Sequence, residues 1–444
     1  MKRMLITVMG GLYILRDKGL LSRANKEELR RWEGIPKSSY RIRKVNPNTA
    51  SFDEWIAKTP NYHVKFMLRM KVECFRLLVD KVGSSRYLYS SESHCRRNDC
   101  QHVPPITRLA ITVMILGGIS ALVAANCFNV NGKTAYKYFL QGISAIEESH
   151  NLFIPRNAFD TTEKLNSLAE GFNKKTWNYS SLEPAERTMQ GCVGAIDGVI
   201  FKMIQPSVLC PKSYRNRKGG HAIVSMAVCD SEYKFIFFDS GIKGSVHDMT
   251  GFRNGSLHDW LYPPNCPGPL DETDFWIAGD NAFVNNNSLL TPFAKLNVRN
   301  ADTFCTRRSY NEKLSSLRVH IEQAFGILIA KFRILKNIVN RSYPDHVSAI
   351  ADACACLHNH CREFSIATGT EEPMPTLAST VNDQHGTREA TVTENSISGH
   401  SFPIQFNSGN EADIGPRIII PDKREHLMRG LRNAGYRFVA RTPR

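Results

Sequence analysis

The sequence has no hydrophobic run long enough to cross a membrane. Residues 1–15 carry two basic residues and a short apolar run, and no small-residue cleavage site precedes Arg16. A membrane-spanning helix needs about 20 apolar residues, and a secretory signal needs a cleavage site. We therefore expect neither a membrane span nor a signal peptide here, and interpret this segment as a packed helix.

The cysteines lack the paired C-x2-C spacing of known zinc modules. All 12 are scattered along the chain, which is typical of reduced thiols in the cytosol or nucleus. Two clusters of Cys and His residues could still hold zinc, because these residue types are its usual ligands. They are His94, Cys95, Cys100 and His102, and then Cys354, Cys356, His358, His360 and Cys361.

Acidic residues are fewer than basic ones. The chain has 42 Asp and Glu against 57 Lys and Arg, so its formal net charge is +15. Such a charge favours a polyanionic partner, with nucleic acid first and an anionic membrane surface second. A solvated basic surface without a partner is the third alternative. The apolar content of 42% is typical of a soluble globular protein, and 444 residues allow two or three domains.

Composition and periodicity divide the chain into five regions, with no fixed-period repeat. The fourth is poor in large apolar side chains and is predicted to be a disordered linker. In chain order, the regions are a basic N-terminal segment (1–60), a helical region (61–185), an α/β domain (186–366), the linker (367–416) and a basic tail (417–444).

Residues 107–146 show the pattern of a helix-turn-helix. An apolar face on residues 109–116 predicts a first helix, which Gly117 and Gly118 end. A short helix over 120–126, a turn and a third helix over 131–143 follow. Because Lys133 and Lys137 lie on that third helix, we expect contact with DNA, although three-helix units without DNA contact share the pattern. Upstream, helical spacing of apolar residues predicts another helix over 62–82.

The α/β domain alternates strands and helices. Residues 191–203 predict a strand buried on both faces, and 222–229 and 233–240 a hairpin. A short strand over 274–278, a helix over 288–296 and a fifth strand over 298–303 follow. Apolar positions at steps of three or four predict a long helix over 310–338.

Three acids occupy key positions of this domain. Asp197 is at the centre of the first strand, Asp280 directly follows the fourth, and Glu322 is on the long helix. If the first and fourth strands are neighbours, the three carboxylates converge, and a divalent metal ion is the usual way to relieve their repulsion. Taken singly, Asp197 fits a turn, Asp280 a turn or helix cap, and Glu322 a surface ion pair with Arg318.

Oxygen-only ligation favours Mg²⁺ or Mn²⁺, and two such ions can drive phosphodiester cleavage. Basic side chains near this site would contact the phosphate backbone. Those candidates are Lys212, Arg215, Arg217, Lys218 and Arg318. His247 and Asp248 are either a further metal or water ligand, or the cap of the next helix.

Several segments together resemble the Harbinger-type DDE transposases and the nuclease-like proteins derived from them, over roughly residues 105–362. At two places the chain departs from the usual family residues, with Val199-Ile200 for Thr-His and Asn281-Ala282-Phe283 for a Gly-aromatic pair. The matching segments are GCVGAIDG (191–198), YRNRKGGHAIVSMAVCD (214–230), GSVHD (244–248), GD (279–280) before LLTPF (289–293), RVHIEQAFGILIAKFRIL (318–335) and CACLHNHC (354–361).

The resemblance implies an RNase H-like catalytic domain preceded by a helix-turn-helix DNA-binding segment. It also implies DNA cleavage and strand transfer that depend on two divalent metal ions. Its catalytic triad falls on Asp197, Asp280 and Glu322. A nuclear role and a Myb-like partner protein are further implications, and bringing two DNA ends together leads us to expect a homo-oligomer.

Two hypotheses therefore stand. The first is an active, metal-dependent transposase acting on double-stranded DNA. The second is a transposase-derived DNA-binding or adaptor protein without catalytic activity. The three acidic positions favour the first, since each still carries a carboxylate.

Overall fold

The computed structural model describes residues 50–89, 103–176, 189–217, 219–293, 301–341, 343–370 and Leu427. The expected N-terminal helix, the His94–His102 group, Lys218, and most of the linker and basic tail lie outside the described residues. None of the described helices combines the length and the apolar character that a membrane crossing requires.

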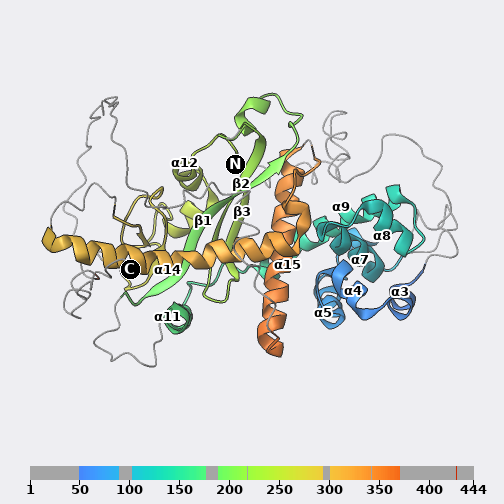
Figure 1. Ribbon diagram of the computed structural model, residues 1–444, viewed down its shortest axis with the longest axis horizontal. Coiled ribbons are helices and arrows are strands. Elements are labelled where there is room, and N and C mark those ends of the chain that lie inside the picture. Colours follow the sequence, from blue (N-terminus) through green and yellow to red (C-terminus); the bar gives the residue numbers. More distant parts are fainter. Residues whose placement is uncertain are drawn as a thin grey trace, which may run out of the picture.

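A five-stranded mixed sheet forms the centre of the molecule (Figure 1). Its order is β3-β2-β1-β4-β5, with β1, β2 and β3 antiparallel and with β4 and β5 parallel to β1. This arrangement confirms the predicted RNase H-like α/β fold. The strands are β1 (Cys192–Met203), β2 (His221–Cys229), β3 (Phe235–Lys243), β4 (Trp276–Ala278) and β5 (Leu289–Leu290).

The prediction for the fifth strand was wrong in its position. Residues 288–296 were expected to be helical, but Leu289 and Leu290 pair with β4 instead. The side-chain oxygen of Asn286 accepts hydrogen bonds from the backbone N–H groups of Ser288 and Leu289, which holds the chain in a turn before the strand. The expected strand over 298–303 was also wrong where it is described, because residue 301 already belongs to the long helix.

Helices cover both faces of the sheet, because both faces are apolar. On one face, Ala195, Val199 and Phe201 of β1 share a core with residues of α14 (Ala301–Lys331) and α15 (Pro344–Thr368). On the other, Val193 and Ile196 pack with α11 (Thr162–Thr176), α12 (Asp248–Arg253) and α13 (Ser256–Leu261). Figure 1 shows α14 running across the sheet and α15 crossing its end.

The helical region lies beyond α15 and contains the three helices predicted over 107–146. The helix expected over 62–82 is instead two, since Arg69 takes a left-handed conformation (φ 57°) between them. The helices here are α3 (Phe52–Lys58), α4 (Asn61–Leu68), α5 (Val72–Val82), η1 (Arg86–Leu88), α7 (Pro105–Leu116), α8 (Ala121–Cys127), α9 (Gly132–Glu148) and α10 (His150–Phe153).

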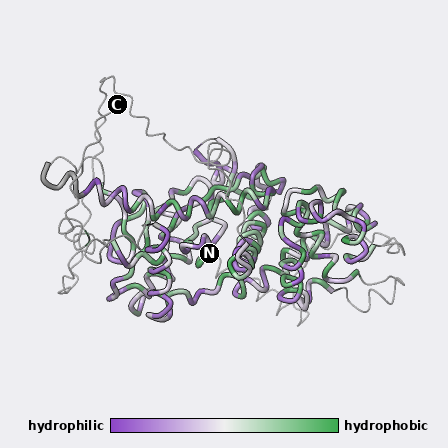
Figure 2. The backbone as a smooth tube through the Cα atoms, turned by 60° about the horizontal axis from the view of Figure 1, so that its bottom comes forward, coloured by the Kyte–Doolittle hydropathy of each residue, from purple (hydrophilic) through white to green (hydrophobic). Residues whose placement is uncertain are grey.

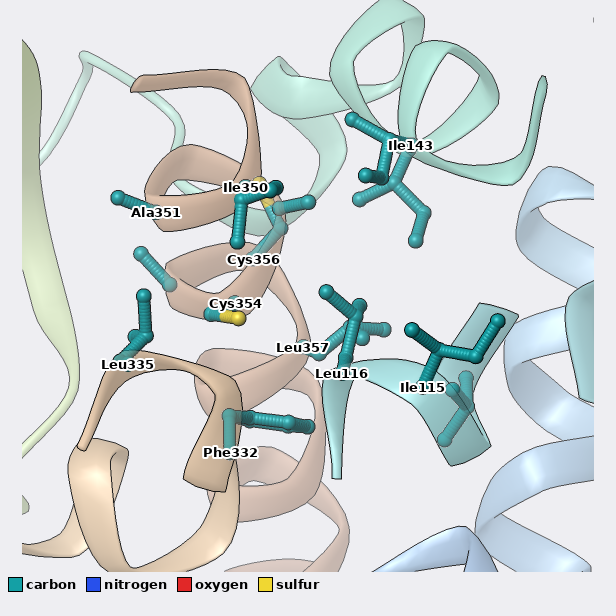
Figure 3. Packing of buried hydrophobic residues seen from close by; sticks show 14 of the residues in the cluster. Ile115, Leu116, Ile143, Phe332, Leu335, Ile350, Ala351, Cys354, Cys356 and Leu357 are labelled. Atoms are coloured by element: carbon teal, nitrogen blue, oxygen red, sulfur yellow. The ribbon is translucent and has the colours of Figure 1, made fainter. Parts of the chain in front are cut away.

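The helical region and the sheet share one hydrophobic core. Leu116 of α7 lies beside Leu357 of α15, Ile143 of α9 lies on the same side of that helix, and Leu335 lies on its opposite side (Figure 3). Figure 2 shows hydrophobic stretches on both sides of α15, interleaved with hydrophilic residues along the helices. The boundaries of the five regions stay predictions, but α15 is buried between two of them and ties them together.

Candidate active site

The pairing of β1 with β4 brings Asp197 and Asp280 to the same level of the sheet. In the parallel register Ala195 is opposite Ala278, and each acid follows two residues later. Side chains alternate along a strand with a period of two, and paired strands lie about 4.8 Å apart. The condition for convergence derived from the sequence is therefore met, because β1 and β4 are neighbours.

The long helix α14 brings Glu322 and Arg318 to the same place. Ile321 is fully buried in the core that also contains Ala195 and Val199, the residues on either side of Asp197 on that sheet face. Arg318 reaches both acids with one nitrogen. Its Nη1 lies 2.6 Å from Oε1 of Glu322 and 3.6 Å from Oδ2 of Asp197.

The Asp197 carboxyl is harder to ionise than an ordinary aspartate. Burial and the nearby charge of Asp280 raise its pKa from 3.8 to about 7, and Glu322 adds to that effect. The Gly198 N–H, which donates a 2.7 Å hydrogen bond, and the Arg318 guanidinium act in the opposite direction. The side chain is still 21% exposed, so solvent and ions can reach it.

Each acid also has the local partner expected of an isolated acid. Asp280 accepts a hydrogen bond from the Ala282 N–H at 2.8 Å, which is a turn contact, and Glu322 pairs with Arg318 one helical turn earlier. These contacts use one oxygen of each carboxylate. The local contacts and the convergence coexist, because a carboxylate has two oxygens with about four lone-pair sites.

The donor chemistry of this cluster fits a divalent ion, although the cluster as it stands is not closed around one. Within the described part of the chain, no group of three or more His, Cys, Asp or Glu residues is arranged to hold a metal ion. Asp197 and Glu322 instead share the Arg318 cation. Three partly exposed carboxylates that repel each other are nevertheless a suitable donor set for Mg²⁺ or Mn²⁺.

The basic loop after β1 lies away from these carboxylates. Met203 pairs with His221 at that end of the sheet, six residues from Asp197, a separation of about 20 Å along the strand. Lys212, Arg215 and Arg217 are all exposed there. Of the predicted basic residues that the structure describes, only Arg318 is in contact with the acids.

His247 lies against this loop and not against the acids. Its Nδ1 contacts Nη2 of Arg217. His247 is also the residue before α12, but its side chain makes no capping hydrogen bond, and Asp248 is the first residue of the helix. The role of His247 and Asp248 as a further ligand stays a prediction.

The predicted DNA-contacting lysines lie on α9. Lys133 and Lys137 are both exposed, and the Asn131 side chain accepts from the Lys133 N–H at the start of the helix. Ser120 caps α8 in the same way, by accepting from the Val123 N–H. These caps explain why the sequence located both helices correctly, since Ser and Asn favour helix starts.

The Cys and His residues of α15 are buried in the core. Nε2 of His358 donates to the carbonyl of Tyr233 at 2.7 Å, and Nε2 of His360 donates to that of Cys74 at 2.8 Å. Burial lowers the pKa of both histidines, that of His358 to about 3. The two imidazoles thus connect α15 to the β2–β3 turn and to α5.

Comparison with known proteins shows which family part of this chain matches. Residues 196–359 match the family described as DDE superfamily endonuclease. The chain is similar to proteins named "Putative nuclease HARBI1", at 30% identity over 174 residues in Rattus norvegicus and 29% over 174 residues in Homo sapiens. These alignments cover 38% of this chain and 46% of each relative, so the chain spans just under half the length of those relatives. No solved structure matches the chain.

Proposed function

Residues 196–359 form a DDE superfamily endonuclease domain homologous to the HARBI1 nucleases, and on that premise we propose that the chain is a divalent-metal-dependent DNA nuclease of the transposase type. The observation that carries the proposal is the position of Asp197. Asp197 and Asp280 each lie two residues after the paired Ala195 and Ala278 of β1 and β4. Asp197 is close enough to Asp280 and Glu322 for their charges to raise its pKa, and it is in contact with Arg318.

Asp197, Asp280 and Glu322 would hold Mg²⁺ or Mn²⁺. A divalent ion bound there would activate an attacking oxygen and neutralise charge on the leaving oxygen. The protein supplies the remaining parts. The rigid β1–β4 pairing fixes two carboxylates, and α14, anchored by the buried Ile321, fixes the third.

Arg318 has two roles in this proposal. While no metal ion is bound, it neutralises part of the charge on Asp197 and Glu322. With a divalent ion held by these carboxylates, the guanidinium would be free beside the acids to hydrogen bond to a DNA phosphate. Guanidinium groups suit that task because they present several N–H donors in a planar fork.

Strand transfer, double-stranded DNA as substrate and a nuclear location belong to the same proposal. The net charge of +15 and the exposed lysines of α9 support DNA as the partner. A homo-oligomer that brings two DNA ends together, and a Myb-like protein that assists recognition, are proposed from the resemblance alone. Mass measurement of the protein with DNA, and imaging of the tagged chain in cells, test these parts.

The central test is nicking of supercoiled plasmid in the presence of Mg²⁺ or Mn²⁺. We expect Glu322→Gln and Asp280→Ala each to lower the nicking rate by about 100-fold or more, the scale on which removal of one electrostatic catalytic group acts. The metal chelator EDTA should abolish nicking by the unmodified protein.

The same helix supplies a matched control. Glu312 forms an Arg–Glu pair with Arg308 at the same spacing as Glu322 with Arg318, but both Glu312 and Arg308 are 52% exposed. Glu312→Gln should leave nicking unchanged. Equal activity in the Glu322 and Glu312 variants would place the reaction elsewhere. DNA binding without nicking in all proteins would support the adaptor hypothesis.

A further inference from the structure

Two arginines that are far apart in the sequence meet at the turn between α7 and α8. Arg69 follows α4, and Arg333 follows the end of α14, in η6 (Arg333–Leu335). They flank two consecutive glycines. A Cβ atom on Gly117 would lie 2.8 Å from Cγ of Arg69, and one on Gly118 would lie 2.9 Å from Cβ of Arg333. Gly118 also has φ +94°, which favours glycine, and a Cβ atom at either position would force the neighbouring arginine to shift.

This juxtaposition is electrostatically unfavourable for the protein alone. Burial and the charge of Arg333 lower the pKa of Arg69. In the part of the chain that the structure describes, neither guanidinium forms an ion pair with a carboxylate. Arg76, by contrast, forms an ion pair with Asp53.

Local packing accounts for only one of the two side chains. Arg69 donates from Nε to the Gly117 carbonyl at 3.2 Å and lies over the Phe66 ring, with its Cζ atom 4.5 Å from the ring centroid. Arg333 is exposed, and its guanidinium makes no hydrogen bond or ring contact of this kind with any residue that the structure describes. A like-charged pair with one exposed member and no acid beside it is suited to an external anion.

We propose that Arg69 and Arg333 bind a phosphate of the duplex DNA backbone at the α7–α8 turn. This inference rests on the proposed function, because it takes DNA as the partner. The exposed member follows directly on α14, the helix that carries Arg318 and Glu322. From Glu322 to Lys331 the helix advances nine residues, or about 14 Å, which equals roughly four base pairs of B-form DNA.

The pair therefore extends the DNA contact from the carboxylates along α14 to the helical region, in the direction that Figure 1 shows. It also connects the two parts of the protein that would contact DNA. The α7–α8 turn leads directly into α8 and α9, where Lys133 and Lys137 lie. A phosphate held at this turn would set the position of the duplex relative to the carboxylates and to the lysines of α9.

The test measures the affinity of the full chain for a short fluorescent duplex by anisotropy at several salt concentrations between about 50 and 200 mM. Each lost phosphate contact lowers the slope of log K against log salt by about 0.9. Because the pair is proposed to hold one phosphate, Arg69→Ala with Arg333→Ala should lower the slope by about one, and Arg333→Ala alone by up to about one. Replacement of both residues with lysine should keep most of the slope.

Arg308→Ala is the charge-matched control, because it removes one arginine from the opposite part of α14, where Arg308 is paired with Glu312. It should leave the slope unchanged. Arg333→Ala alone decides the matter if the double variant does not fold, since Arg333 is exposed. Salt slopes equal to that of the unmodified chain would overturn this inference while DNA binding itself persists. Absence of any DNA binding by the unmodified chain would overturn both this inference and the proposed function.

Discussion

The acids around Asp197 and the histidines of α15 are two groups of side chains that the sequence offers as metal ligands, and the structure treats them differently. Asp197, Glu322 and Arg318 remain between a fifth and a third exposed. His358 and His360 are almost fully buried, and each gives one ring nitrogen to a backbone carbonyl. The first group keeps oxygens available to solvent, whereas the second is committed to holding helices and strands together.

Electrostatics separates the two groups in the same way. Burial disfavours the charged form in both, so the pKa of Asp197 rises and the pKa of His358 falls. For His358 the consequence is a neutral side chain that suits a core. For Asp197 the consequence is a carboxyl group that ionises less readily, and a cation bound beside it would favour the charged form. This difference distinguishes a candidate active site from a structural cluster.

The largest effect on stability is expected in the histidine cluster. His358→Ala removes a buried ring and leaves the Tyr233 carbonyl without its donor, so we expect the free energy of unfolding to fall by about 2–4 kcal/mol. Urea denaturation measures this loss. His63→Ala, at an exposed position, should change it by no more than about 0.5 kcal/mol. If the His358 variant were as stable as the His63 variant, the structural role of α15 histidines would be wrong.

A smaller effect on stability is expected at Asp197, and its dependence on pH is opposite to that of His358. Its pKa is about 7 in the folded chain and 3.8 ordinarily, so the unfolded chain loses this proton first as pH rises. The contribution of Asp197 to stability should therefore decrease between about pH 4 and pH 7 and stay constant above. Without divalent ions, Asp197→Asn should raise the free energy of unfolding by about 1–3 kcal/mol at pH 8, and by nothing near pH 4.

For His358 the direction is reversed. Its pKa is about 3 in the folded chain against an ordinary 6.5, so stability is lost as pH falls below about 6.5. Denaturation curves of the Asp197→Asn and His358→Ala variants across this range separate the two contributions. Parallel curves for wild type and both variants would mean that neither group is perturbed as described.

The smallest effect concerns Arg318. Because its guanidinium pairs with Asp197 and Glu322 in the absence of metal, it competes with a divalent ion for the same oxygens. A partly exposed ion pair is worth about 0–1 kcal/mol, so Arg318→Gln should tighten Mn²⁺ binding by roughly two- to five-fold. Isothermal titration calorimetry measures this affinity. Arg308→Gln, which breaks the equivalent exposed pair, should leave it unchanged, and weaker binding in the Arg318 variant would refute the competition.

Much of the sheet could be predicted from the sequence because the hydrophobic runs of β1, β2 and β3 are long. The helical periodicity of α14 was equally clear. The sequence made convergence of the carboxylates conditional on β1 and β4 being neighbours, and the structure meets that condition. The short β5 was missed, since two leucines are too few to show a strand period. Its position depends on hydrogen bonds from Asn286 and on pairing with β4, which are tertiary features.

The composition of the candidate site was predictable, but part of its geometry was not. The sequence places Arg318 one turn before Glu322, and the structure confirms that contact. The sequence also suggested that the basic loop serves the same phosphate, but only the strand register reveals its distance of about 20 Å from Asp197. The Arg69–Arg333 pair has no sequence signal, because its members are brought together only by the packing of η6 against α7.

The single core that α15 shares with α7 and α9 limits how this protein can change in evolution. A recombination event that replaced the helical region with another module would leave Leu335, Leu357 and their neighbours facing side chains of the wrong shape. Interiors at native packing density tolerate such mismatches poorly. Substitutions should therefore be tolerated best on the exposed surface of α8 and α9, while the buried contact between the helical region and the sheet is inherited as one unit.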